Sequence, residues 1–272
     1  MVAAISGAMI PKSQDRTIRD FGNQWMRCPQ NEGYSASMDF SKDICGPLLN
    51  ISEIKGNKVL EIGSGTGRIV KMLLAAGAGK VIAAEPSEAY KKLIINSRSR
   101  MDKKNFIHGK GAEISEVNAD IAFSIGVLHH IPDPQPTANK IDKCLRLGGK
   151  FLSRVYGIKG SEIYLKIFQP MWKMTSKLPD KILAGFAYLL NILPTTYIFF
   201  CKLFPFPFYR YIRNVFSKLD FKNRLLITFG QLNPVYAKYY SRQEAQILLR
   251  KSGFINIVNY HRHEYSWRVL GE

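Results

Sequence analysis

The feature that most constrains this chain is a glycine-rich segment at residues 59–69, VLEIGSGTGRI. Its first apolar residues predict a short buried strand, and the apolar residues beyond the glycines recur at helical spacing. Gly63, Gly65 and Gly67 carry no Cβ, so the backbone between strand and helix can turn sharply and approach a ligand closely. Such strand–turn–helix units bind nucleotides in α/β proteins, because the helix N-terminus and free amides face the ligand.

The glycines alone do not identify the ligand, because in the dinucleotide fingerprint the third glycine comes one residue later. A carboxylate further along the chain helps to identify the ligand. Residues 81–84 predict a second apolar strand, and Glu85 follows it directly. An acid about 20 residues beyond the glycine turn, at the tip of the neighbouring strand, can accept hydrogen bonds from both hydroxyls of a ribose. The other interpretation is that Glu85 caps the next helix.

Three segments together resemble the class I S-adenosylmethionine-dependent methyltransferases: residues 61–67, Glu85, and residues 124–134 with the sequence SIGVLHHIPDP. The resemblance covers residues 57–156. It implies S-adenosylmethionine as the cofactor and methyl transfer as the reaction. On the positions that match the family, it implies cofactor contacts at Glu61, Gly63, Ser64, Gly65, Gly67, Glu85, Pro86, Ala112, Glu113, Gly126 and Val127.

The adenine side of the site departs from the family pattern. Members often carry an acid after the third strand, where it bonds the adenine amino group. Here Gly111 occupies that slot, and Ala112 and Glu113 follow it. We therefore expect adenine to be held by the backbone and Ala112, with Glu113 as a further contact.

Alternating strands and helices predict an α/β fold with a parallel sheet covered on both faces. The resemblance implies a Rossmann-like, mostly parallel sheet of seven strands, in which a C-terminal hairpin supplies one antiparallel strand, and an α-helical cap is inserted. Ser241 and Glu244 form a predicted capping box before that hairpin. The expected divisions are an N-terminal arm and lid at 1–56, the α/β core at 57–157, the cap at 158–232 and the completion of the sheet at 233–272.

The expected cap contains apolar helical stretches rich in aromatic residues. It carries 11 Lys and Arg against three acids, and no acid lies between Asp180 and Asp220. Residues 182–204 are nearly continuously apolar and long enough to span a membrane, but Pro194 near their middle argues against a straight span. We favour a cap that covers the active site. Helices that lie in a membrane interface, and a true span, are the alternatives.

The whole chain has a formal net charge of +18, which favours an anionic partner such as nucleic acid, a phospholipid surface or an acidic substrate. The charge does not choose between these partners. Four cysteines without metal or redox spacing favour free, mostly buried thiols in a reducing compartment. The first ten residues do not predict a signal peptide, because no basic start precedes their apolar run. We expect a cytoplasmic protein, and peripheral contact with an anionic membrane stays open.

Methyl transfer from a sulfonium is an in-line displacement, so alignment of donor and acceptor supplies much of the rate. His129 and His130 follow the fourth strand, and histidine can titrate near neutral pH. By resemblance, residues 126–129 line the methionine end of the cofactor, so we predict that His129 faces the pocket as a general base. The other interpretation is that both histidines are structural.

The sequence says less about the molecule that accepts the methyl group. No Asn/Asp-Pro-Pro-aromatic motif or Pro-Cys pair follows the fourth strand, and no carboxylate cluster predicts a metal. We expect metal-free transfer to a small molecule, at oxygen. The cap resembles bacterial methyltransferases that often accompany glycan or secondary-metabolite assembly. A lipid or lipid-linked acceptor is the alternative, and RNA is less favoured because no RNA-binding module is recognised.

Aromatic and amide side chains are the candidates for contacts with the acceptor. By resemblance, Trp25 and Tyr34 belong to a lid that follows an irregular arm at residues 1–20. Ordinary packing is the other interpretation of each candidate, and the oligomeric state is not predicted. The predicted substrate-side residues are Trp25, Tyr34, Tyr156, Asn233, Tyr236 and Tyr240.

Overall fold

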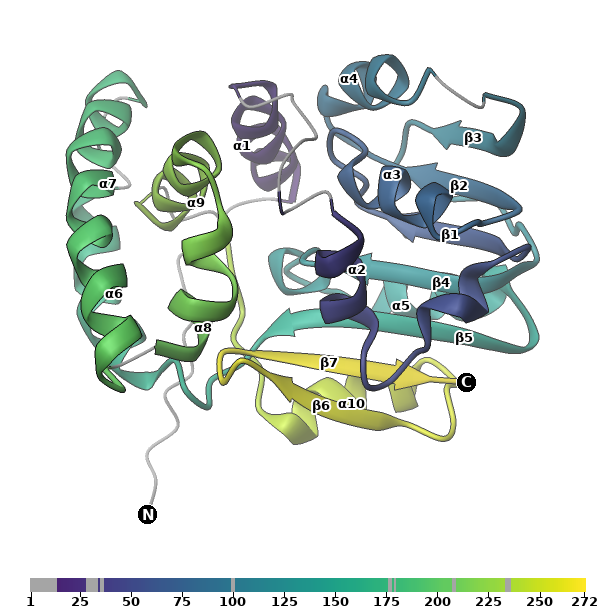
Figure 1. Ribbon diagram of the computed structural model, residues 1–272. Coiled ribbons are helices and arrows are strands. Elements are labelled where there is room, and N and C mark those ends of the chain that lie inside the picture. Colours follow the sequence, from purple (N-terminus) through teal and green to yellow (C-terminus); the bar gives the residue numbers. More distant parts are fainter. Residues whose placement is uncertain are drawn as a thin grey trace.

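The computed structural model describes residues 14–27, 34, 37–98, 101–175, 178, 180–206, 209–232 and 236–272. Its centre is a seven-stranded sheet with the order β3-β2-β1-β4-β5-β7-β6 (Figure 1). The strands are β1 Lys58–Ile62, β2 Lys80–Ala84, β3 Lys104–Ile107, β4 Ala119–Ile125, β5 Leu145–Tyr156, β6 Val258–Arg262 and β7 Ser266–Gly271.

The first five strands pair in parallel, and β7 runs antiparallel to both β5 and β6. The prediction of a mostly parallel, seven-stranded sheet with one reversed strand is therefore confirmed. The strand order reverses between β1 and β4, since β1 is followed outward by β2 on one side and by β4 on the other. In open α/β sheets the ligand crevice lies at such a reversal, outside the carboxyl ends of the strands.

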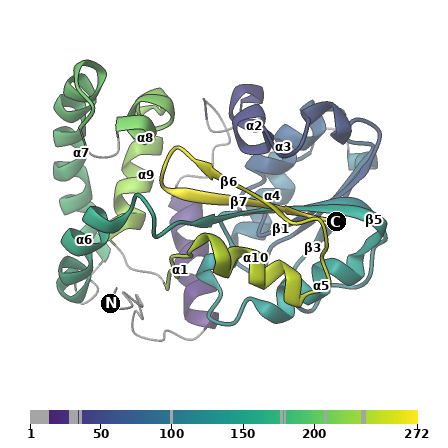
Figure 2. The same cartoon turned by 90° about the horizontal axis from the view of Figure 1, so that it is seen from below.

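Helices cover both faces of the sheet (Figure 2). One face packs against α2 Met38–Cys45, α3 Arg68–Ala75 and α4 Ala89–Asn96, which contribute buried residues to one apolar core. The other face packs against α5 Gln135–Cys144 and α10 Arg242–Lys251 around a second core. Continuous apolar strands such as β1 and β2 require this two-sided burial.

The ends of α10 show how local sequence sets the boundaries. The Ser241 hydroxyl accepts a hydrogen bond from the Glu244 amide, and the Glu244 carboxylate accepts one from the Ser241 amide, so the predicted capping box is present. At the other end, Gly253 has a φ of +106°, a conformation that favours glycine. Three buried thiols, Cys45, Cys144 and Cys201, are free.

The inserted helices between β5 and α10 form a separate layer beside the sheet (Figure 1). They are α6 Glu162–Thr175, α7 Asp180–Leu203, α8 Tyr209–Asn214 and α9 Phe221–Leu232. Leu183 and Ala187 of α7 pack on Leu232 of α9. Among the described residues, no helix is both long enough and apolar enough to cross a membrane.

The N-terminal part differs from its prediction. Residues 1–13 lie outside the described residues, but α1 Gln14–Arg27 is a regular helix where an irregular arm was expected up to residue 20. Thr17, Ile18, Phe21 and Trp25 recur at the spacing of one helical face, which explains the element. Helix α2 ends before the Gly46–Pro47 pair, and a short 3-10 turn follows at Ile51–Ile54.

Candidate active site

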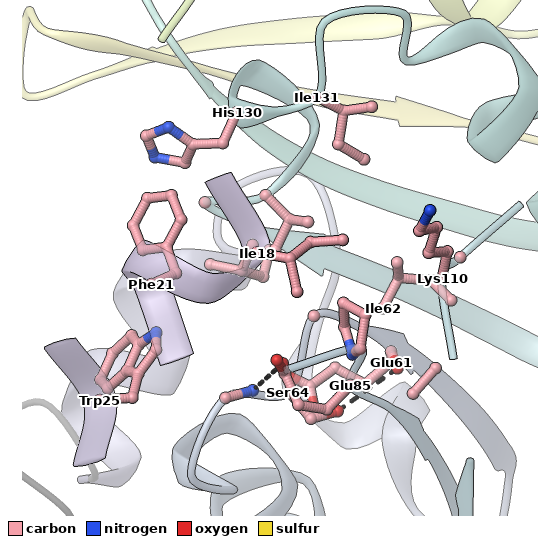
Figure 3. Close-up of a pocket in the computed structure, with 18 of the residues that line it drawn as sticks. Ile18, Phe21, Trp25, Glu61, Ile62, Ser64, Glu85, Lys110, His130 and Ile131 are labelled. Carbon is pink, nitrogen blue, oxygen red and sulfur yellow. Dashed lines mark hydrogen bonds between the residues drawn. The ribbon is translucent and has the colours of Figure 1, made fainter. Parts of the chain in front are cut away.

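A cleft opens at the carboxyl ends of β1, β2 and β4, and α1 forms its outer wall (Figure 3). The turn after β1, the end of β2 and the segment after β4 supply most of the inner wall. The residues that line the cleft in these three segments are Glu61, Ile62, Gly63, Ser64, Gly65, Thr66, Arg68, Ile69, Ala84, Glu85, Pro86, Ile125, Gly126, Val127, His130 and Ile131.

The glycine turn is shaped by close neighbours. Gly63 and Gly65 both have positive φ angles, +76° and +53°. A Cβ on Gly63 would lie 2.3 Å from a Val127 methyl group, and a Cβ on Gly65 would lie 3.3 Å from the Trp25 ring. Gly67 has a φ of +92° at the N-cap of α3 and does not line the cleft. Glycine is needed at Gly63 and Gly65 for both conformation and space, and at Gly67 for conformation.

Glu85 links the ends of two strands. One of its carboxylate oxygens accepts a hydrogen bond from the Gly65 amide at 2.7 Å, and the other accepts one from the Ser87 amide at 3.0 Å. The side chain is buried yet lines the cleft. Glu85 therefore holds the glycine turn and the chain that leads into α4. It does not cap that helix, because the N-cap of α4 is Glu88 and no side chain caps it.

Two groups of opposite charge lie near the glycine turn. Glu61 is 1% exposed, and its Oε2 atom has no hydrogen-bond partner among the described residues. Burial, with the charge of Glu85 adding to it, raises the pKa of Glu61 to about 7. The Arg68 guanidinium lies 5.2 Å from the centre of the Trp25 ring, and burial lowers the pKa of Arg68 to about 10. Its Nε atom also lacks a partner within the described parts of the chain.

The two histidines differ in their access to the cleft, although their ring centres lie only 4.1 Å apart. His130 lines the cleft, whereas His129 is fully buried outside it and packs on Tyr156, with ring centres 3.9 Å apart. The expectation that His129 faces the pocket is therefore wrong. Both residues lie in a short 3-10 turn at Leu128–His130, in which consecutive side chains leave the backbone in different directions.

The protonation of His130 follows from its neighbours. Its Nδ1 atom lies 2.8 Å from the backbone oxygen of Tyr236. A carbonyl oxygen only accepts, so Nδ1 carries the hydrogen and Nε2 of the neutral ring keeps its lone pair. Burial lowers the pKa of His130 to about 4. The ring packs edge-on against Phe21 of α1, with centres 4.4 Å apart (Figure 3).

The predicted substrate-side residues are dispersed. Trp25 lines the cleft, and Tyr236 contributes the carbonyl that holds His130. Tyr34 lies outside the cleft, where its hydroxyl donates to the Asn214 backbone oxygen at 3.3 Å. Tyr156 also lies outside the cleft, against His129 and Tyr239, and Tyr240 is buried beside Gly157. Asn233 lies outside the described residues.

On the expected adenine side, Lys110 and Gly111 line the cleft, whereas Ala112 and Glu113 do not. The expectation that Ala112 and Glu113 reach the cleft is therefore not met. A Cβ on Gly111 would lie 2.8 Å from methyl groups of Ile62 and Thr137, so the position has no room for an acidic side chain.

Sequence reasoning missed several residues of the cleft. Thr17, Ile18 and Phe21 line it from α1, and their helical spacing was the available signal. Arg68 follows directly on the last glycine of the turn. No residue of α6–α9 in the described ranges lines the cleft, so α1 takes the place that was expected for the cap. Within the described parts, no group of three or more His, Cys, Asp or Glu side chains could hold a metal ion.

The sequence of the core matches a known family. Residues 60–153 match the family model described as a methyltransferase domain. This segment is a methyltransferase domain of the class I S-adenosylmethionine-dependent type. The cofactor of this family is S-adenosylmethionine, and the matched segment contains the glycine turn, Glu85 and the His129–His130 pair.

Curated relatives of this methyltransferase are similar over a part of their length. The tRNA U34 carboxymethyltransferase of Alteromonas mediterranea is 31% identical over 121 residues, which are 42% of this chain and 36% of that protein. The ubiquinone biosynthesis O-methyltransferase of Vibrio atlanticus is 27% identical over 124 residues, 41% of this chain and 52% of that protein. The match thus spans about a third to a half of the relatives.

Solved structures extend the likeness of fold over most of the methyltransferase. The DhpI–SAH complex superposes with a TM-score of 0.56 at 13% identity, and covers 95% of this chain and 96% of the other. The PH0226 protein from Pyrococcus horikoshii OT3 superposes with a TM-score of 0.52 at 16% identity, and the match covers 86% of this chain and 90% of the other. Sequence identities this low show a shared fold and do not identify the methyl acceptor.

Proposed function

We propose that this chain transfers a methyl group from S-adenosylmethionine to an oxygen atom of a small molecule, without a metal ion. The observation that carries the proposal is His130, a neutral ring that lines the cleft and whose Nδ1 is engaged by the Tyr236 carbonyl. Its Nε2 lone pair is thereby available to a hydroxyl group.

The cleft fits the cofactor of the family through its unpartnered charges. Glu61 Oε2 would accept a hydrogen bond from the ammonium of the methionine part, and Arg68 would bind its carboxylate. Glu85 lines the cleft at the position suited to the ribose hydroxyls, and the glycine turn leaves room for close approach. Pro86, Gly126 and Val127 complete this part of the proposed cofactor site.

The bound cofactor supplies an electrophilic methyl group on a sulfonium. The chain supplies position and a proton acceptor: His130 Nε2 would orient the acceptor hydroxyl and take its proton as the new C–O bond forms. A base with a low pKa is sufficient, because an oxygen that has gained a methyl group is strongly acidic. Phe21 and Trp25 of α1 would exclude water from this region.

Other acceptors stay as alternatives to a small molecule. The relatives named as tRNA U34 carboxymethyltransferases match 42% of this chain, so more than half of it lies outside the match. A lipid or lipid-linked acceptor is favoured over RNA by the exposed apolar helix described below. Glycan or secondary-metabolite intermediates remain the expected context of the small-molecule proposal.

The test is an incubation with methyl-labelled cofactor and an extract of the source cell, separated into water-soluble, lipid and RNA fractions. We expect label in a small molecule, and loss of that label with His130→Ala. His108→Ala is the matched control, because His108 stacks on Tyr90 and does not line the cleft. Label in RNA alone would overturn the proposed acceptor, and cofactor binding without any labelled product would overturn catalysis.

A further inference from the structure

Helix α7 is apolar on two opposite faces. Leu183, Ala187, Ile198 and Cys201 are buried on one face, where the helix meets α8 and α9. The opposite face carries six large apolar side chains that are 42–61% exposed. This set, called the α7 stripe, consists of Ile182, Phe186, Leu189, Phe200, Leu203 and Phe204, with Phe204 one residue beyond the helix end.

The α7 stripe consists of two groups on the same side of the helix. Residues 182, 186 and 189 form one group and residues 200, 203 and 204 the other, each with three- and four-residue spacing, and the step of eleven residues from 189 to 200 is about three helical turns. In both views of the molecule α6 and α7 lie at the outer edge of the inserted layer, on the side away from the sheet (Figures 1 and 2). Clusters of large, exposed apolar side chains such as these mark an interaction site.

The charge of the surrounding region indicates what covers the stripe. Residues 158–232 carry 11 Lys and Arg against three acids, and the whole chain has a net charge of +18. Lys166, Arg213 and Lys222 are exposed on neighbouring helices. Two copies of so basic a layer repel each other, whereas an anionic surface attracts it. Phenylalanine and leucine beside lysine and arginine are the side chains of interfacial helices.

We propose that the α7 stripe docks this protein on an anionic membrane, with α7 lying in the interface between headgroups and acyl chains. The apolar side chains enter the acyl boundary, and the basic residues of the inserted helices meet the lipid phosphates. The docking does not depend on the proposed methyl transfer, since no residue of the stripe lines the cleft. It offers the enzyme a route to amphiphilic acceptors.

The test is co-sedimentation with phosphatidylcholine vesicles that contain or lack phosphatidylglycerol. We expect binding to the anionic vesicles only, and weaker binding as salt is added. The double variant Phe200→Gln, Phe204→Gln should lower the ratio of bound to free protein by about tenfold or more, because it removes two apolar side chains from the interface. Glutamine keeps the helix propensity of the segment.

A matched control removes apolar groups elsewhere that are more exposed than Phe200 and Phe204. The double variant Leu147→Gln, Ile255→Gln changes side chains that are 99% and 65% exposed and lie outside α7, so it should bind vesicles as the wild type does. Cofactor affinity, which requires a folded cleft, should be equal in all three proteins. Hydrogen exchange of the wild type, in which vesicles should protect residues 182–204, gives a readout that needs no variant.

Three results would overturn the proposal. The first is a wild type that stays unbound to anionic vesicles at low salt. The second is equal binding by the stripe variant and the control. The third is a wild-type dimer, seen by analytical ultracentrifugation, that the stripe variant dissociates while neither protein binds vesicles. That third outcome would assign the stripe to a second copy of the chain.

Discussion

The Gly65 amide donates a hydrogen bond to a Glu85 carboxylate oxygen across 2.7 Å, which ties the turn after β1 to the end of β2. We predict that Glu85→Ala weakens cofactor binding by at least about tenfold. The same variant should lower the free energy of unfolding by about 1–3 kcal/mol, because the Gly65 and Ser87 amides lose their buried acceptor. Calorimetric titration and urea unfolding measure both effects. Glu88→Ala is the control, since Glu88 pairs with Lys91 at the surface. An unchanged affinity in Glu85→Ala would contradict the role of Glu85.

Glu61 should make cofactor affinity depend on pH. Its pKa is raised to about 7 by burial, so the free protein holds a proton there below neutral pH. Binding of an ammonium needs the carboxylate, and affinity should therefore rise with pH, by up to about tenfold per unit below pH 7. Affinity measured by titration across neutral pH checks this. In Glu61→Gln the affinity should be weaker and this slope should vanish; a slope that persists would assign the proton to another group.

The raised pKa of Glu61 also makes the free energy of unfolding depend on pH. A buried acid whose pKa is raised in the fold binds more protons folded than unfolded. Its effect therefore makes the free energy of unfolding fall as the pH rises from the unfolded value of 4.5 to about 7. Glu61→Gln should remove this component, which urea unfolding at several pH values can detect.

His130 should control the rate of methyl transfer, and the pH dependence of that rate should show no titration near pH 6.5. With cofactor saturating, we predict that His130→Ala lowers kcat by about 10²-fold, with a smaller change in KM for the acceptor. The pKa of His130 is lowered to about 4 by burial, so the neutral ring is present above that pH and lost as the pH falls through it. Initial rates between weakly acidic and neutral pH test this. An acidic limb at the usual histidine pKa, absent from His130→Ala, would show that the ring titrates normally.

A buried ion pair joins the two ends of the fold. The Arg262 guanidinium of β6 is 0% exposed and contacts the Asp43 carboxylate of α2, while His263 Nε2 lies 2.9 Å from the other oxygen. Asp43→Asn should lower the free energy of unfolding by about 3–5 kcal/mol, because Arg262 is left buried without its anion. Asp39→Asn, on an exposed position of the same helix, should have little effect.

The contribution of the Asp43–Arg262 ion pair to stability should depend on pH, which tests this prediction. Burial alone would raise the pKa of Asp43, but the hydrogen bond from His263 and the charge of Arg262 outweigh it and lower the pKa to about 2. The stabilisation is fully present above the unfolded value of 3.8 and is lost as the pH falls through about 2. The difference between wild type and Asp43→Asn in urea unfolding should shrink over that range. A constant difference would mean that the ion pair is not its cause.

Local patterns predicted the parts of the site that depend on neighbouring residues in the chain. The turn after β1 needs three glycines, and these three positions have positive φ angles. The strand that ends at Glu85 is visible as an apolar run, and the sheet edge then brings the acid to Gly65. These relations are determined by strand–helix alternation, which sequence periodicity reports directly.

Contacts between distant segments were beyond the sequence. The choice between His129 and His130 depends on the Tyr236 carbonyl, which approaches from more than 100 residues away. The aromatic content of residues 158–232 suggested a cover for the cleft, but α1 provides that wall with Phe21 and Trp25. Apolar composition shows that a helix needs a partner and does not say which partner it has.

The reversed strand β7 also determines when the fold can be completed during synthesis. Because β7 lies between β5 and β6, β5 lacks a neighbour on one side until residues 266–271 have left the ribosome. The Arg262 partner of Asp43 emerges at nearly the same time. Nascent chains that already contain the glycine turn therefore expose an open sheet edge, which is the stage at which a chaperone would be needed most.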